Sequence, residues 1–418
     1  MSSEKVIQTL DQRAYKIPTN MKKTLSILLF LSSIYLLNAA VISVSPGTKT
    51  IYDAVATAQS GDILELTDGV YNETSTVIIN KSLTIKNALN SSPVINVNRF
   101  TIKANFTLQG VTFDGNSTAS EGIRIDEGQN LIIKILNSDI QNFTSRAINF
   151  YATSKTVAFV DTLIVDGCKF QNTIRALQAT TALEQFKHLE IKNSTFYKLD
   201  KDGYFINMSP GGENLASGVK VIIDHCTFYN CFSRRGVYLA NLDGAEVTNN
   251  IAFYSETVGD TKSFSTYGSN SIVRNNISYN VDLYGSAPRQ NVIVQNPLFV
   301  DSENGNLQLY ANSPAIGAGD NGSNLGDPNW GVSNEDAPLG VLPYVPFKKP
   351  YTMSPTANSV RVMWQMLDTI SKGVVYYGKT EALGDSIVSN DGWLVEEEGF
   401  VHVKELTGLD PSTTYYYQ

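Results

Sequence analysis

The chain has 418 residues, a formal net charge of −8 at pH 7 and an apolar content of 42%. This length allows two domains, and the ordinary apolar content excludes both a disordered chain and a protein made of many membrane spans. The negative net charge disfavours a general polyanion-binding surface such as a nucleic-acid coat, although a local basic strip is compatible with it. Three cysteines are too few for a disulfide framework.

Residues 21–40 are expected to serve export. Residues 1–20 are polar and patternless, and we expect them to be an over-read upstream of a true start at Met21. A charged opening at Met21–Lys23, an apolar run over Leu25–Leu37 and small residues at Asn38–Ala40 follow. This order predicts a secretory signal peptide over residues 21–40, too short for a membrane-spanning helix. We therefore expect a secreted or cell-surface protein.

A short phrase recurs between about residue 83 and residue 299, in which β-branched residues precede a turn and then an apolar or aromatic residue. Its copies are Gly110–Phe113, Asn137–Ile140, Gly167–Phe170, Asn193–Phe196, His225–Phe228, Asn250–Phe253 and Asn276–Tyr279. A period of 20 to 50 residues marks a repeat architecture, and alternation without a 3.6-residue period makes each unit a set of short strands. The sequence predicts an all-β parallel β-helix over residues 41–337.

The start of this region has its own signature. Residues 51–58 are apolar on one helical face, and Gly61-Asp62, a strand-like run and Asp68–Tyr71 follow. A short amphipathic helix here would cover the open end of the first coil. This opening and the repeated phrase closely resemble the pectate-lyase-like right-handed β-helix family over roughly residues 45–330. The resemblance implies a right-handed solenoid. The segment that ends the repeats, Asn296–Asp301, is similar in sequence to that of exported β-helix proteins from glycan-degrading bacteria.

Two kinds of residue are expected to stack from coil to coil. The asparagines expected to share one hydrogen-bonded structural column are Asn87, Asn137, Asn193, Asn250, Asn276 and Asn296. Cys168 and Cys226 occupy the same place in the phrase, two coils apart with Ser194 between them. Since coils stack at roughly 4.8 Å, these thiols are too distant to bridge and are expected to be buried small residues.

The pattern changes after a Pro-rich linker over residues 338–350. Short alternating strands are predicted at Ser359–Trp364, Gly373–Gly378, Val401–Lys404 and Gly408–Tyr415. This stretch resembles a fibronectin type III module, specifically the leader domain of purple-acid-phosphatase-like metallophosphoesterases, and we expect it to be incomplete at Gln418. The histidines that a phosphatase site would need are scattered, at His188, His225 and His402. We therefore place no phosphatase site in this chain, although a longer parent protein could carry one. The alternative is a carbohydrate-facing or wall-facing spacer module.

The most promising group of basic residues lies where the chain begins a new strand after each repeated motif and its turn. These positions are called coil restarts. Glu121, Arg146, Arg175, Asp202 and Arg235 each precede Ala or Gly and then an apolar residue, so they should form a line along the outside, flanked by Lys201 and Arg234. One interpretation is a strip of arginines that grips carboxylates or sulfates of an acidic glycan. The other is a surface ladder in which Arg146 and Arg175 pair with Glu121 and Asp202.

The family resemblance also raises lyase chemistry. β-Elimination on a uronic acid needs a base and a cation that stabilises the developing enolate. The stretch from Lys262 to Arg274 resembles the lysine-bearing coil of alginate and chondroitin-type lyases, which implies catalytic roles for both residues. The resemblance leaves open whether Ca²⁺ is a cofactor, because the acidic ligands expected on neighbouring coils are not recognisable. The alternative for Lys262 is a solvated loop charge.

Two further patterns argue against other enzymes of this fold. Ile223-Asp224-His225-Cys226 resembles a pectate lyase coil, but the accompanying histidine pair and Arg-Pro-Arg segment are missing, so we interpret it as part of the fold. Neither an Asp-Asp doublet nor a Gly-His-Gly triplet occurs, which counts against a polygalacturonase.

The sequence therefore favours an exported protein that engages an acidic polysaccharide along an arginine-lined face, with β-elimination open as an activity. The alternatives are a non-catalytic glycan-binding or surface-scaffold protein, or the first part of a longer metallophosphoesterase-containing protein.

Overall fold

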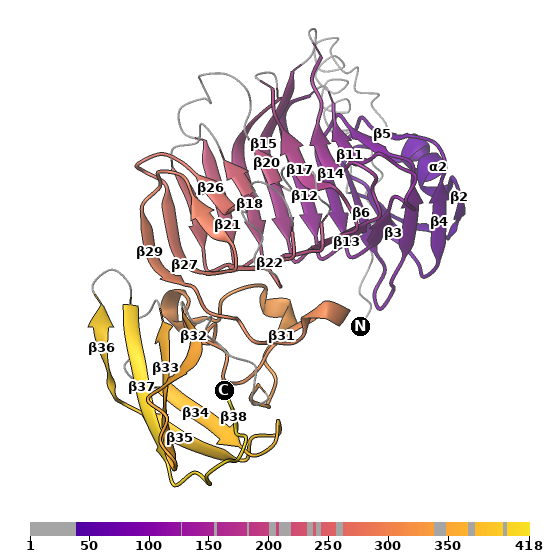
Figure 1. Cartoon of the computed structure of the whole chain (residues 1–418). Coiled ribbons are helices and arrows are strands. Elements are labelled where there is room, and N and C mark those ends of the chain that lie inside the picture. Colours follow the sequence, from indigo (N-terminus) through magenta and orange to yellow (C-terminus); the bar gives the residue numbers. More distant parts are fainter. Residues whose placement is uncertain are drawn as a thin grey trace, which may run out of the picture. The chain divides into compact units, whose positions relative to one another are not determined.

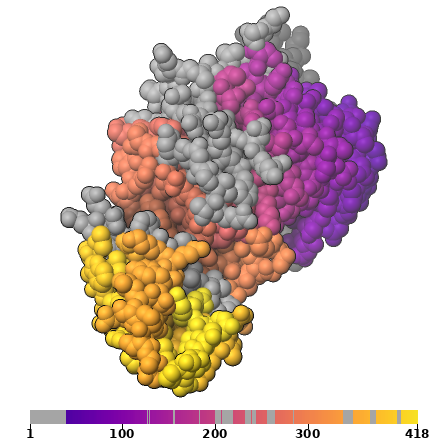
Figure 2. All heavy atoms as spheres, viewed as in Figure 1, coloured from indigo at the N-terminus to yellow at the C-terminus, as the bar shows by residue number. Residues whose placement is uncertain are grey.

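The computed structural model describes residues 39–126, 128–153, 157–181, 184–199, 206–208, 219–231, 237–239, 244–255, 262–337, 348–366, 373–395 and 399–418. The predicted over-read and nearly all of the predicted signal peptide lie outside these residues, as does most of the linker. From Val41 to Ile293 the chain winds into a right-handed parallel β-helix (Figure 1). Its coils follow the sequence as successive bands from indigo to orange (Figure 2). This confirms the predicted fold class.

Each coil contributes strands to three faces. The first face comprises β1 (Val41–Val44), β3 (Ile63–Leu66), β6 (Leu83–Asn87), β9 (Phe106–Gln109), β12 (Gly128–Leu136), β15 (Ala158–Asp166), β18 (Glu184–Lys192), β21 (Lys220–Asp224), β24 (Ala245–Thr248), β27 (Ile272–Tyr279) and β29 (Arg289–Ile293). The second face comprises β2 (Gly47–Thr48), β4 (Val70–Glu73), β7 (Val94–Val97), β10 (Thr112–Asp114), β13 (Asp139–Gln141), β16 (Lys169–Gln171), β19 (Thr195–Tyr197), β22 (Thr227–Tyr229), β25 (Ile251–Phe253) and the end of β27. The third face comprises β5 (Val77–Ile79), β8 (Phe100–Ile102), β11 (Glu121–Ile125), β14 (Arg146–Phe150), β17 (Arg175–Ala179), β20 (Ile206–Met208), β23 (Val237–Leu239), β26 (Lys262–Thr266) and β28 (Asp282–Tyr284).

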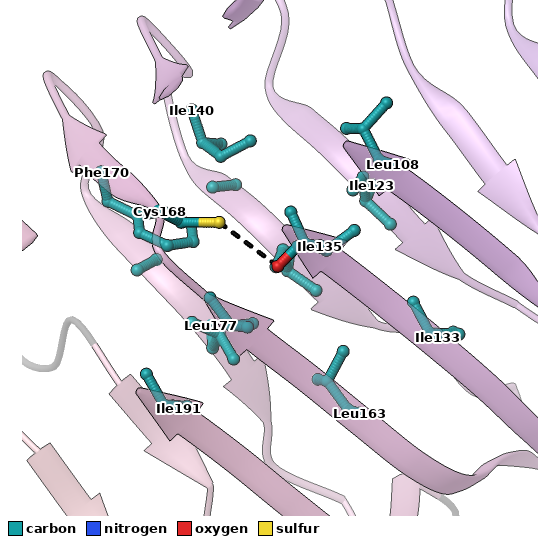
Figure 3. Packing of buried hydrophobic residues seen from close by; sticks show 14 of the residues in the cluster. Leu108, Ile123, Ile133, Ile135, Ile140, Leu163, Cys168, Phe170, Leu177 and Ile191 are labelled. Carbon is teal, nitrogen blue, oxygen red and sulfur yellow. Dashed lines mark hydrogen bonds between the residues drawn. The ribbon is translucent and has the colours of Figure 1, made fainter. Parts of the chain in front are cut away.

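Apolar columns fill the interior. On the first face one register column runs through Ile85, Leu108, Ile135, Val165, Ile191, Ile223 and Val247, all fully buried. β-Branched and other aliphatic side chains suit this position because they pack flat on a pleated surface, directly above their counterparts in the next coil. Figure 3 shows several of these side chains meeting in the core.

The free thiols of Cys168, Cys226 and Cys231 belong to this core. Cys168 donates a hydrogen bond from its Sγ to the Ile135 carbonyl at 3.3 Å (Figure 3). Burial raises the pKa of the Cys168 thiol to about 12. The expectation of buried small residues is confirmed.

A helix closes the first coil, as predicted. Helix α2 (Thr50–Thr57) buries Ile51 and Val55 against β4 and β5. Its amino-terminal N–H groups find a partner in another coil, because the buried Glu73 carboxylate accepts from Ile51 N at 2.9 Å and Tyr52 N at 3.1 Å. No helix in the described part of the chain is both long and apolar enough to span a bilayer.

The predicted phrase slips by one residue in its last two copies. Phe228 pairs with Ala252, so Phe253 lies beside Tyr229 and Tyr279 beside Phe253. These three rings therefore point outward instead of into the core. They stack face to face, with ring centroids 5.2 Å and 5.3 Å apart.

The predicted asparagine column divides for the same reason. Asn137 and Asn193 occupy the left-handed turn position, together with Asn249 and Asn275. Asn250 and Asn276 lie one residue further on, where they are buried and bond to backbone groups. The paired asparagines Asn249-Asn250 and Asn275-Asn276 concealed this shift from sequence reasoning, because both residues suit tight turns.

A covering segment, residues 297–337, makes the outward rings possible. It contains β30 (Phe299–Asp301), η1 (Ser302–Asn304), β31 (Asn306–Leu309), η2 (Asp320–Gly322) and η3 (Pro328–Trp330). Leu307, Leu309 and Leu325 form a second buried cluster with Tyr229 and Phe253. Polar contacts also bind it to the coils, since Tyr229 donates to Glu303 Oε1 at 2.6 Å. The second face is therefore sealed where these rings lie.

The C-terminal residues form two antiparallel sheets with sandwich features. Their strands are β32 (Lys348–Met353), β33 (Ser359–Met366), β34 (Gly373–Gly378), β35 (Asp385–Ser389), β36 (Gly392–Val395), β37 (Gly399–Thr407) and β38 (Tyr416–Tyr417). Three of the four predicted strands are present. The fourth prediction, Gly408–Tyr415, was wrong: this stretch is a turn with left-handed Gly408 and Ser412, and the Tyr415 hydroxyl accepts from Asp410 N at 3.2 Å, as in a tyrosine corner.

Candidate functional site

The predicted restart row exists on the third face. Glu121 of β11 pairs in register with Arg146 of β14, which pairs with Arg175 of β17. A second outward row runs beside it, through Arg124, Asn149 and Gln178. Alternation places the second row outward, because the residues on both sides of each member are buried: Ile123 and Ile125, Ile148 and Phe150, and Leu177 and Ala179.

Glu121 is the centre of these two rows. Its carboxylate is buried, with 6% of the residue exposed. Arg124 donates to Oε2 from both Nε and Nη2 at 2.6 Å, and Asn149 donates to Oε1 at 3.0 Å. Arg146 Nη1 lies 3.7 Å from Oε1 and Arg99 Nη1 lies 3.8 Å from Oε2. Three guanidinium groups thus surround one carboxylate and leave a local surplus of positive charge.

Arg175 extends this charge to the next coil. Its Nη1 donates to Gln178 Oε1 at 2.7 Å, which fixes the guanidinium beside Arg146 on the neighbouring strand. At the other side, the guanidinium of Arg124 lies 4.2 Å from the centre of the Tyr151 ring. The name arginine face is used below for Arg99, Arg124, Arg146 and Arg175 with Glu121, Asn149 and Gln178.

Among the described residues, two arginines of the arginine face have unpaired hydrogen-bond donors. The Nε atoms of Arg99 and Arg146 are buried and lack a hydrogen-bond partner within the described residues. The surface ladder predicted as the alternative pairs Arg146 with Glu121, but that contact is the long one and Arg124 makes the short contacts. The side chains of Arg99 and Arg146 keep 30% and 28% of their area exposed, so their charge is accessible from outside.

Sequence reasoning found only part of this cluster. It missed Arg124, although the apolar residues Ile123 and Ile125 on either side of it indicate that it points outward, and it missed Arg99, whose coil lacks the restart pattern. Arg235, Arg234, Lys201 and Asp202 lie outside the described residues.

The two residues predicted as catalytic belong to different faces. Lys262 begins β26 on the third face, where its backbone pairs with Asp282, and Arg274 lies in β27 on the first face. Arg274 Nη2 contacts Asp320 Oδ2 at 2.6 Å, and this contact raises the pKa of Arg274. Arg274 therefore binds the covering segment. The structure does not bring it to the arginine face.

A metal site is the remaining expectation to place. In the described ranges, no group of three or more His, Cys, Asp or Glu side chains could hold a metal ion. Glu121, the carboxylate of the arginine face, already accepts from Arg124 and Asn149. The oxygens of Glu121 are thus already used, and this set of residues does not fit a Ca²⁺ ion.

Comparison with known families agrees with this geometry. The model of the right-handed β-helix region matches residues 93–263 and 162–321, which together span more than half of the 418 residues. The chain belongs to the right-handed β-helix family. The model of the purple acid phosphatase N-terminal domain matches residues 350–418, in agreement with the C-terminal resemblance. No curated protein sequence matches this β-helix protein.

Several solved structures are similar to this β-helix protein. One is an alginate lyase of the PL6 family, with 23% identity and a TM-score of 0.40, over 63% of this chain and 39% of that one. Another is a pectate lyase, with 15% identity and a TM-score of 0.41, over 70% of this chain and 97% of that one. The Dettilon tailspike protein matches with 11% identity and a TM-score of 0.32, over 92% of each chain. The present chain thus spans about two fifths of that alginate lyase.

Proposed function

We propose that the arginine face binds an acidic polysaccharide. The observation that carries this proposal is the convergence of Arg99, Arg124 and Arg146 on the single carboxylate of Glu121, with Arg175 one coil further on. Guanidinium groups present paired N–H donors that match the two oxygens of a carboxylate or sulfate. Glu121 and Gln178 hold two of these groups in place, so less side-chain entropy is lost when a ligand binds.

The shape of the surface favours a linear ligand. The basic residues follow one another on strands of successive coils, so an extended chain lying along the helix axis would meet several of them in turn. Tyr151, beside Arg124, adds an aromatic side chain next to the charges. The chain as a whole carries −8, and a nucleic-acid ligand would be repelled by the remainder of such a surface.

Cleavage of the bound polysaccharide by β-elimination would extend this proposal, and it rests on Lys262 as the base. Lys262 begins a third-face strand, three strands beyond β17 in the sheet order. Production of unsaturated uronate groups, read by their ultraviolet absorbance, distinguishes a lyase from a protein that only binds.

The test is the double variant Arg146→Ala with Arg175→Ala. We expect it to lose retention on affinity gels that contain an acidic glycan, while its melting temperature stays close to that of the wild type. The physical reason is that Arg146 makes one long ionic contact and Arg175 bonds to a neutral amide, so neither is essential to the core.

The matched control is Arg289→Ala with Arg361→Ala, which removes the same charge from exposed positions elsewhere. Retention should survive in the control and weaken as salt is raised in the wild type. Equal retention of the two double variants would exclude the arginine face as the binding site.

A further inference from the structure

Asp224, His225 and Ser323 form a hydrogen-bonded chain away from the arginine face. His225 Nδ1 lies 2.8 Å from Asp224 Oδ2, and His225 Nε2 lies 3.0 Å from Ser323 Oγ. An ionised carboxylate can only accept, so Nδ1 carries the proton and donates it to Asp224. In the neutral imidazole, Nε2 is then the acceptor for the Ser323 hydroxyl. This acid, base and hydroxyl order is the arrangement that activates a serine nucleophile.

The carboxylate at the end of this chain is firmly held. Asp224 Oδ1 accepts from Thr248 Oγ1 at 2.7 Å and from Asn249 Nδ2 at 2.8 Å, which leaves Oδ2 for the imidazole. Burial acts to raise the pKa of Asp224, but the hydrogen bonds from His225, Thr248 and Asn249 outweigh it and hold the pKa below its ordinary value. Asp224 is thus equipped to orient the ring and to stabilise an imidazolium.

The serine comes from the covering segment. Ser323 directly follows η2, and its turn is closed by hydrogen bonds from Ser323 N to Asp320 O at 3.1 Å and from Gly319 N to Ser323 O at 2.8 Å. A Cβ atom at position 319 would lie 2.4 Å from Ser323 Oγ. Glycine at this position therefore leaves the hydroxyl the room to face His225.

A pocket adjoins these groups. His225 and Ser323 both line a cavity of about 280 Å³, together with Asn193, Asn324 and Asp327. Asn324 Oδ1 accepts from Gly317 N at 3.0 Å, so the group that Asn324 has to offer is its NH₂ donor. An amide donor beside a serine is one way to stabilise the oxyanion of acyl transfer. A cavity of this size suits a short acyl group.

We propose that Ser323, His225 and Asp224 hydrolyse short-chain O-acyl esters. Ser323 Oγ attacks the carbonyl carbon while its proton passes to His225 Nε2. The C–O bond to the alcohol then breaks, and the alcohol leaves with that proton. Water attacks the acyl-serine, gives one proton to His225, and the acid departs as the Ser323 hydroxyl recovers the proton. Neither an oxidant nor a cofactor is needed.

The test begins with a fluorophosphonate probe, which reacts covalently with activated serines. We expect peptide mass spectrometry of the labelled full chain to place the adduct on Ser323. Hydrolysis of p-nitrophenyl acetate should exceed that of the octanoate ester. Ser323→Ala, His225→Gln and Asp224→Asn should each lower kcat/KM by about 100-fold or more.

Ser333→Ala, in the same covering segment, is the matched control and should hydrolyse the ester like the wild type. If the wild type takes up no probe, the hydrogen bonds among Asp224, His225 and Ser323 serve only to attach the covering segment to the coils. Equal hydrolysis by wild type and Ser323→Ala would lead to the same conclusion. Either result overturns the proposal, and thermal unfolding of each variant shows whether it is folded in the assay.

Discussion

In two places a single carboxylate holds several parts of this protein together. Glu121 collects three arginines on the third face, and Asp327 joins the covering segment to a coil by accepting from Thr195 Oγ1 at 2.7 Å. Glu121 is buried and Asp327 is half-buried, so each is sensitive to the loss or gain of one charge. Their environments nevertheless differ, because Glu121 faces cations while burial raises the pKa of Asp327 to about 6.

Replacement of Glu121 by Gln removes the charge but keeps the shape. We expect the free energy of unfolding to fall by roughly 1–3 kcal/mol, because loss of one partner of a buried ion pair is costly while partial exposure of the arginines reduces that cost. Urea unfolding followed by circular dichroism measures the change. Glu246→Gln, whose side chain is 45% exposed and lies 3.8 Å from Lys220, is the control. Equal midpoints for both variants would contradict a central role for Glu121.

The raised pKa of Asp327 predicts a pH-dependent stability. Below about pH 4 the group is protonated in both the folded and the unfolded state. Between its ordinary pKa of 3.8 and its folded pKa of about 6 the folded state binds more protons, so stability falls as pH rises. The loss reaches about 3 kcal/mol above pH 6, at 1.36 kcal/mol per pKa unit.

Asp327→Asn removes this titration. We expect the difference in free energy of unfolding between wild type and Asp327→Asn to shift against the wild type from pH 4 to pH 6.5 and then to level off. Asp301→Asn, at an exposed position of the same segment, should show no such shift. A pH-independent difference for Asp327→Asn would show that the carboxyl does not titrate in this range.

At the scale of elements, the first coil depends on a helix that does not cap itself. Lys49 at the start of α2 makes no side-chain capping bond, and Glu73 of β4 supplies the acceptor instead. The carboxylate also lies at the positive end of the helix dipole. One side chain thus connects the closing helix to the second face.

Glu73→Gln should loosen this connection. The amide keeps one acceptor oxygen but turns an NH₂ group toward a helix N–H, and an unmade buried hydrogen bond costs about 1–3 kcal/mol. We expect faster hydrogen exchange at the amides of Ile51 and Tyr52, with little change in coils beyond β9, since coils contact mainly their neighbours. Glu65→Gln, in a half-exposed pair with Lys86, is the control. Unchanged exchange at Ile51 would count against the cap.

At the scale of the whole molecule, the features that recur in every coil could be predicted from the sequence, whereas the features that occur once could not. Alternation and the recurring turn are local, so the solenoid and the row Glu121, Arg146 and Arg175 followed from them. The one-residue shift of the repeated motif at Asn250 could not be predicted from the sequence. Phe228-Tyr229 and Ala252-Phe253 both place an aromatic residue near the expected position. Ser323 lies 98 positions from His225 in a segment without a period, and only folding brings the two together.

The burial of Cys168, Cys226 and Cys231 in the interior has a practical consequence. These are all the cysteines of the chain, and burial raises the pKa of each thiol, so they are slow to react with alkylating reagents in the native state. A cysteine introduced on the surface would therefore be the preferred target of a maleimide dye. The native protein thus offers a background on which a fluorescent reporter can be attached at one chosen position, without removal of any natural thiol.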